Sequence, residues 1–223
     1  MKLEKEDKPL SVKINSDIFV KAAEKAFDCV NDGISKFYPW KKPDTPKDFN
    51  IGVIVGGSGS GKTTMLARFG KEVEPKWDSD KSIVSHFKSP DEAINLLTAV
   101  GLNSVPSWYK PYHVLSNGEK FRADLARKVK DGAVIDEFTS VVDRNVAKAA
   151  SVALVRYIKK NNIKNVVLST CHRDILEWLE PDWVVDTDLG EYTEGFFLVD
   201  QKLKSTFIEQ INISGECLKT ITI

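Results

Sequence analysis

Apolar residues along the chain fall into two patterns: short continuous blocks and longer stretches with helical spacing. The blocks are rich in Val and Ile and are bounded by polar residues, which is typical of strands buried on both faces of a sheet. Together with weaker alternating runs, they predict six strands, at residues 10–14, 49–55, 81–87, 133–136, 165–170 and 183–188.

The stretches with helical spacing carry start signals. Ser89 precedes Pro90 and stands three residues before Glu92, an arrangement that caps the first turn of a helix. Asp143 is placed to cap a longer helix with one apolar face. Helices are expected at residues 17–30, 61–70, 89–101, 116–132 and 143–160, with a short one after residue 170.

Strands and helices of these lengths in alternation predict an α/β fold, with a mostly parallel core sheet and flanking helices. The 223 residues are enough for one main domain, assigned to residues 1–205. The remaining tail, residues 206–223, alternates only weakly, and its pattern indicates no role.

Charge and cysteine content narrow the class of protein. Acidic and basic residues number 32 each, so the net charge does not support nucleic acid as a partner, although local basic patches would allow it. No apolar run reaches the ~18 residues that span a bilayer, and the charged N-terminus lacks the apolar core of a signal peptide. With three widely spaced cysteines, we expect a soluble, cytoplasmic protein without a transmembrane segment or a structural metal.

Residues 56–64, GGSGSGKTT, directly follow the apolar strand 49–55. Glycines let the backbone curl so that successive N–H groups point at phosphate oxygens, and the following helix adds its positive end. Lys62 is expected to reach the β- and γ-phosphates, and Thr63 to ligate Mg²⁺. The predicted nucleotide-binding residues of this phosphate loop are Gly56, Gly57, Ser58, Gly59, Ser60, Gly61, Lys62, Thr63 and Thr64.

A second apolar strand ends in two acids, Asp136 and Glu137. At the end of a strand, the Asp136 carboxylate emerges at the sheet edge beside the phosphate loop, where it can hold Mg²⁺ through a water. Glu137 is then placed to polarise an attacking water as a general base.

The segment LSNGEKFRADLARKV, residues 115–129, resembles the signature of the ABC-type ATPases, written L-S-G-G-Q before a helix rich in Arg and Ala. Leu115, Ser116 and Gly118 match that pattern. Asn117 stands where a glycine is usual, and Glu119 where a glutamine is usual. Taken alone, Ser116 would equally serve as an ordinary helix cap.

Spacing strengthens the resemblance. Asp136 follows Ser116 by 20 residues, the separation expected in this superfamily. SVVD, residues 140–143, resembles the family's loop at the dimer interface, and His172 in LSTCH resembles its switch histidine, which contacts the γ-phosphate. The ordered set extends over about residues 48–190.

The resemblance implies a P-loop NTPase of the ABC type that binds and hydrolyses ATP with Mg²⁺. It gives Lys62, Glu137 and His172 catalytic roles and makes Thr63 and Asp136 the metal ligands. It also implies a head-to-tail dimer, in which Ser116 and Gly118 of one copy reach the ATP bound by a second copy of the chain.

Two features depart from the family's pattern. The glutamine that usually helps to hold Mg²⁺ is missing, because Gln201 and Gln210 both lie far downstream. The strand predicted at 81–87 places His86 or Ser85 near that position, and His86 is the favoured replacement. The helical insert, at about residues 87–115, is shorter than the one by which transporter ATPases grip their membrane subunits.

The aromatic residue that stacks on adenine in this family is sought upstream of the phosphate loop. Tyr38 and Trp40 are the predicted residues, with Phe37 as a further candidate. Packing beneath the proline-rich loop that follows would explain the same aromatic residues equally well.

Residues 101–129, 134–143 and 169–192 are most similar to a group of ABC-type ATPases that are often fused to a predicted acetyltransferase-like domain. This implies a non-transport ATPase that drives or gates a separate partner, an acetyltransferase-like enzyme or one that acts on nucleic acid. The alternatives are the ATP-binding subunit of a membrane transporter and a nucleotide-dependent switch with little turnover.

Overall fold

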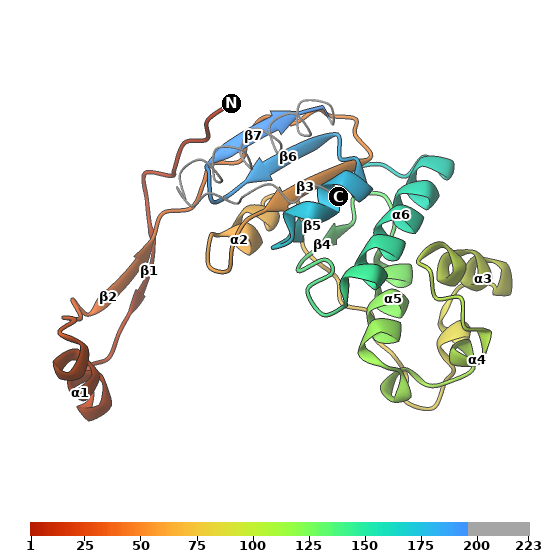
Figure 1. Ribbon diagram of the computed structural model, residues 1–223, viewed down its shortest axis with the longest axis horizontal. Coiled ribbons are helices and arrows are strands. Elements are labelled where there is room, and N and C mark those ends of the chain that lie inside the picture. Colours follow the sequence, from red (N-terminus) through yellow and green to blue (C-terminus); the bar gives the residue numbers. More distant parts are fainter. Residues whose placement is uncertain (196–223) are drawn as a thin grey trace, which may run out of the picture.

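The computed structural model describes residues 1–195, and a five-stranded sheet forms its centre (Figure 1). The strands are β3 (Ile51–Val55), β4 (Val134–Ile135), β5 (Val166–Thr170), β6 (Trp183–Asp186) and β7 (Glu191–Glu194). In the spatial order β4-β5-β3-β6-β7, the first four run parallel and β7 is antiparallel to β6. The predicted α/β class with a mostly parallel sheet is confirmed.

The central strand β3 is buried along its whole length. Since successive side chains of a strand point to opposite faces, Ile51, Val53 and Val55 join the apolar cluster on one face. Ile54 joins the cluster on the other face, which includes Trp183. The phosphate loop therefore follows a strand buried on both faces and lies at the carboxyl ends of the parallel strands.

Helices supply both clusters. On one face lies α2 (Lys62–Leu66), and on the other lie α3 (Pro90–Ala99), α5 (Asn117–Lys128), α6 (Arg144–Lys160) and α7 (Leu176–Leu179). The predicted caps at Ser89 and Asp143 are confirmed, because each side chain accepts backbone N–H groups of the first turn. The helix after the phosphate loop is regular over only five residues and does not reach Gly70 as expected.

The prediction of a strand at residues 81–87 is wrong. This segment forms a single 3-10 turn, η1 (Ile83–His86), that opens a helical insert continuing through α3, α4 (Val105–Trp108) and η2 (Tyr112–Val114). Only Ile83 of the turn is buried, and its N–H donates to Lys110 O at 3.0 Å. The alternating pattern therefore buries one apolar side chain, that of Ile83, and does not form a strand of the sheet.

Residues 10–37 form an N-terminal arm that projects away from the sheet (Figure 1). The arm consists of β1 (Leu10–Lys13), α1 (Ile18–Phe27) and β2 (Ile34–Phe37), with β1 and β2 paired antiparallel. No residue of α1 is buried. The segment before the arm returns to the sheet, where Leu3 N donates to Gly190 O at 2.7 Å.

Among the helices of residues 1–195, none has the length and apolar character needed to cross a membrane. The boundary predicted at residue 205 and the tail 206–223 lie outside the described residues.

Candidate functional site

The phosphate loop connects β3 to α2 and curls tightly around Gly57. Gly61 precedes the helix with a φ of 94°, a left-handed conformation that favours glycine. A side chain there would also meet the ring of Phe37, 2.5 Å from an ideal Cβ. Lys62 Nζ donates to Gly57 O at 2.7 Å, so the lysine lies across the loop into which phosphates are predicted to bind.

Thr63 and Asp136 meet where β3 and β4 end side by side with β5. Thr63 Oγ1 donates to Asp136 Oδ2 at 2.7 Å across 73 residues of chain. Ser169 of β5 donates its hydroxyl to the other oxygen of the same carboxylate. Hydroxyl and carboxylate oxygens suit Mg²⁺, which takes few protein ligands and completes its shell with phosphates and water.

Glu137 directly follows Asp136, and His172 is linked to the same segment of chain. The Glu137 side chain is exposed, and its backbone N–H donates to Asp136 Oδ1 at 2.9 Å. Its φ of 47° turns the chain sharply at the end of β4. Two residues on, Thr139 Oγ1 lies 3.4 Å from His172 Nδ1, which ties the histidine to the segment that carries the acids.

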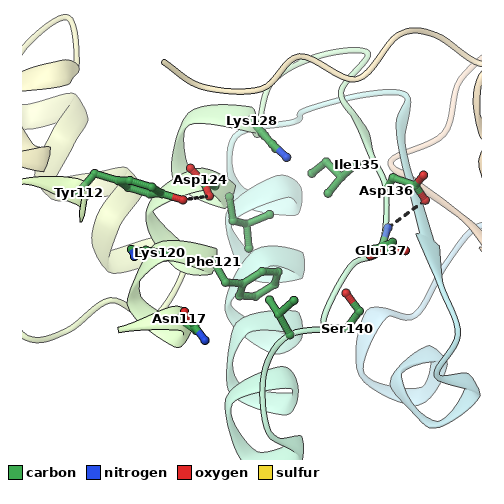
Figure 2. Close-up of a pocket in the computed structure, with 12 residues that line it drawn as sticks. Tyr112, Asn117, Lys120, Phe121, Asp124, Lys128, Ile135, Asp136, Glu137 and Ser140 are labelled. Carbon is green, nitrogen blue, oxygen red and sulfur yellow. Dashed lines mark hydrogen bonds between the residues drawn. The ribbon is translucent and has the colours of Figure 1, made fainter. Parts of the chain in front are cut away.

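A pocket of about 370 Å³ opens between these acids and α5. Figure 2 shows Asn117 and Phe121 of α5 on one side, with Asp136, Glu137 and Ser140 on the other. Glu137 therefore faces open space that could admit water or part of a ligand.

The signature segment begins α5 with a complete capping box. Ser116 Oγ accepts the N–H of Glu119, and the Glu119 carboxylate accepts the N–H of Ser116 at 2.8 Å. Hydrogen bonds to its carboxylate, the largest effect coming from Ser107 and the next from Ser116, lower the pKa of Glu119 to about 2. In Figure 1, α5 and α2 lie apart, on opposite faces of the sheet.

Solved structures share this arrangement of strands and helices. A dimeric bacterial ABC transporter cassette is 13% identical, with a TM-score of 0.53, and the match covers 72% of this chain and 92% of that chain. The same cassette in a post-hydrolysis state, bound to ADP and Pi, is 14% identical, with a TM-score of 0.56 and coverage of 86% and 98%. The chain has the fold of an ABC ATPase cassette.

A third structure, an inward-facing ABC transporter assigned to the metal-chelate type, is 18% identical, with a TM-score of 0.51 and coverage of 72% and 77%. No protein-family model matches the chain, and no curated protein matches it. Of these three structures, two are of a transporter cassette and one is of an ABC transporter, and they do not support the grouping with acetyltransferase-fused ATPases. At these identities they define the cassette fold.

Among the aromatic residues before the phosphate loop, Phe37 lies against it, since an ideal Cβ on Gly61 would come 2.5 Å from the Phe37 ring. Trp40 is engaged elsewhere, since its Nε1 donates to Thr187 O at 2.9 Å and its ring packs against Gly190. Tyr38 is 43% exposed. The prediction that Tyr38 or Trp40 stacks on adenine stays a prediction, and Trp40 would have to leave its contacts to do so.

His86 lies in the helical insert rather than at a strand end. Its Nε2 accepts the Asp78 N–H at 2.9 Å, and its Nδ1 lies 3.0 Å from Ser82 O. Both ring nitrogens are therefore occupied, and Trp77 packs against the ring. The reason for placing His86 beside Mg²⁺, its position at the end of a strand, does not hold in this structure.

Within residues 1–195, no cluster of three His, Cys, Asp or Glu side chains could hold a metal unaided. Mg²⁺ would therefore need the phosphates of a nucleotide besides Thr63 and Asp136, as its preference for oxygen and water ligands allows.

The sequence reasoning missed two acids that border the site. Glu72 Oε1 accepts the N–H of Asp136 at 3.1 Å and pairs with Lys128. Asp188 accepts the N–H of Gly57 in the phosphate loop. Glu72 lies in an irregular segment without a signal, whereas Asp188 follows an apolar strand just as Asp136 ends one, and that position could have singled it out.

Proposed function

We propose that this chain is an ABC-type ATPase that binds Mg-ATP at the phosphate loop and hydrolyses it within a head-to-tail dimer. The observation that supports this best is the 2.7 Å bond between Thr63 Oγ1 and Asp136 Oδ2, because it joins two motifs that were predicted independently. The cassette fold is consistent with the same activity.

Each residue has a role that follows from its position. Lys62 exchanges Gly57 O for phosphate oxygens, while Thr63 and Asp136 hold Mg²⁺. The metal, when bound, offsets the negative charge of the β- and γ-phosphates. Glu137 accepts a proton from the attacking water. The water oxygen bonds to the γ-phosphorus as the bond from phosphorus to ADP breaks and ADP leaves. His172, tied to Thr139, senses whether the γ-phosphate is present.

The head-to-tail dimer in this proposal places the start of α5 of one copy at the ATP bound by a second copy. Ser116, which is exposed, and Gly118, which is partly buried, lie at the start of α5, a helix of 12 residues whose positive end can meet an anion. They would complete the site of a second copy, so that ATP joins the two chains and hydrolysis loosens them.

The test is the Glu137→Gln variant, measured by light scattering with and without Mg-ATP. Removing the base while keeping its shape should lower turnover by about 10²- to 10⁴-fold and trap a dimer that forms only with Mg-ATP. Lys62→Ala should neither bind nor dimerise, whereas Glu177→Gln, on the exposed surface of α7, should behave as wild type.

A wild-type chain that binds no ATP would refute the proposed function. A Glu137→Gln variant that binds ATP and stays monomeric would refute the dimer and leave nucleotide binding intact.

A role outside transport extends the same proposal. The insert between α2 and α5 contains only four short helical elements, which is a small surface for gripping a membrane subunit. The alternative role, as the ATP-binding subunit of a membrane transporter, is favoured by the three structures of like fold, two of one transporter cassette and one of an ABC transporter. Purification of the tagged chain from its native cells distinguishes them: recovery with an integral membrane protein supports transport, and recovery with a soluble enzyme supports the proposed role.

A further inference from the structure

Asp188 follows β6 and faces the phosphate loop from outside. Its two carboxylate oxygens lie 3.0 and 2.9 Å from the Gly57 nitrogen, so the loop N–H donates to both. None of the roles proposed above uses this residue. The contact nevertheless holds the glycine-rich half of the loop, where the backbone has most freedom.

Arg173 clamps the same carboxylate from the other side. Its Nη2 donates to Asp188 Oδ2 at 2.9 Å, and its Nε and Nη2 donate to the carboxylate of Asp186 at 2.8–3.2 Å. Asp186, whose side chain is only 13% exposed, accepts the N–H groups of Asp188 and Leu189 in return. The guanidinium is therefore fixed, and so is the carboxylate that it holds.

The segment 186–188 grips the loop at a second point. Thr187 Oγ1 donates to Val55 O at 3.0 Å and lies 2.6 Å from Ser60 Oγ. Burial disfavours the charge of Asp188, but the Gly57 N–H, Arg173 and Lys62 together hold the pKa of its carboxyl below the ordinary value. Asp188 is thus an anion that supports an anion-binding loop.

We propose that Asp188 is a positioning residue, which, held by Arg173, fixes the phosphate loop in the shape that receives nucleotide phosphates. Because Arg173 directly follows His172, the same carboxylate links the loop to the segment that would sense the γ-phosphate. The inference rests on the proposed binding of nucleotide by residues 56–64.

Two effects of removing the carboxylate have opposite signs. Loss of a negative charge near the phosphates should tighten nucleotide binding, whereas loss of a preorganised loop should weaken it. The proposal requires the second effect to exceed the first, so the sign of the change in affinity tests it.

The first experiment compares hydrogen exchange of the phosphate-loop amides without nucleotide. In Asp188→Ala and in Arg173→Gln, amides of residues 57–61 should exchange several-fold faster than in wild type, because a charge-assisted hydrogen bond is lost. Glu180→Gln is the matched control, since it breaks the exposed Lys159–Glu180 pair (2.6 Å) away from the loop. Unchanged exchange in both test variants would overturn the inference.

The second experiment measures the Kd of a fluorescent ADP and a fluorescent ATP, and the kcat and KM of hydrolysis. Asp188→Ala should raise both Kd values and KM about tenfold and change kcat little, which is the pattern of lost uniform binding. Tighter binding in this variant would overturn the inference and leave the proposed function standing. A wild-type chain that binds neither nucleotide would overturn the proposed function, and the inference with it, whatever the exchange rates.

Discussion

Glu119 illustrates how a single residue can serve the fold at a position where a role in the site is expected. It stands where the ABC signature usually has glutamine, and either residue can close a capping box with Ser116. The glutamate adds a charge that accepts bonds from the Ser107 hydroxyl and from the N–H and hydroxyl of Ser116. The departure from the family's pattern therefore has a local stabilising reason.

A pH-dependent stability follows from this charge. Because the folded pKa of Glu119 is lowered from 4.5 to about 2, its carboxylate stabilises the fold fully above pH 4.5, and this contribution is lost as the pH falls toward 2. Wild type should therefore exceed Glu119→Gln in free energy of unfolding at neutral pH, by less than about 1 kcal/mol because solvent screens the site. Urea titrations at several pH values measure the difference.

The difference should disappear near pH 2. Glu177→Gln, which removes an exposed carboxylate elsewhere on the surface, is measured beside Glu119→Gln as the control. A gap between wild type and Glu119→Gln that stays constant with pH would contradict the assignment.

At the scale of elements, β3 packs closely on Trp183 of β6. Gly52 lies directly over the indole, and an ideal Cβ at Gly52 would come within 2.0 Å of Trp183 Cζ2. Trp183 also stacks on Phe69, at 5.0 Å between ring centroids, and meets Phe49 edge-on. Phe49 and Phe69 therefore restrict any movement of the Trp183 ring away from Gly52.

Gly52→Ala should therefore destabilise the protein by about 1–3 kcal/mol through overpacking, as a lower urea midpoint would show. Gly118→Ala is the matched control, because its Cβ would meet only the flexible end of Arg122, at 3.9 Å, and alanine favours a helix. Equal stability of Gly52→Ala and wild type would mean that β3 and β6 can separate without cost.

How much of this fold the sequence predicts depends on whether an element carries its own signal. The buried strands β3 and β5 and the capped helices α3 and α6 were predictable, because apolar runs and caps act locally. The turn at Ile83–His86 was not, because its residues alternate as in a strand while tertiary contacts, such as the bond from Ile83 N to Lys110 O, hold it outside the sheet. Likewise, Thr63 and Asp136 were predictable from motifs, whereas Glu72 depends on tertiary contact alone.

The whole molecule combines a well-packed cassette body with an N-terminal arm that packs poorly. Phe19 and Phe27 of α1 are 77% and 81% exposed. A ten-residue helix and a two-stranded hairpin are each marginal in water without burial of an apolar face. The arm should therefore open at much lower free energy than the sheet.

Limited digestion with chymotrypsin should accordingly cut first within residues 18–38 and leave the body intact. Tyr109 is the internal control: it is 67% exposed, yet it adjoins the buried Trp108, so cleavage there should be slower. Cleavage at Tyr109 before any site in the arm would contradict this order of stabilities.

The left-handed backbone at Glu137 has a consequence for the balance between durability and chemistry. Glutamate at a φ of 47° carries a conformational cost that glycine would not, and Thr139, at 68°, carries another two residues later. Folding alone would be served as well by glycine at residue 137. Glycine would relieve that cost but would lack the carboxylate that the proposed hydrolysis needs, so durability and the proposed chemistry favour different residues at this position.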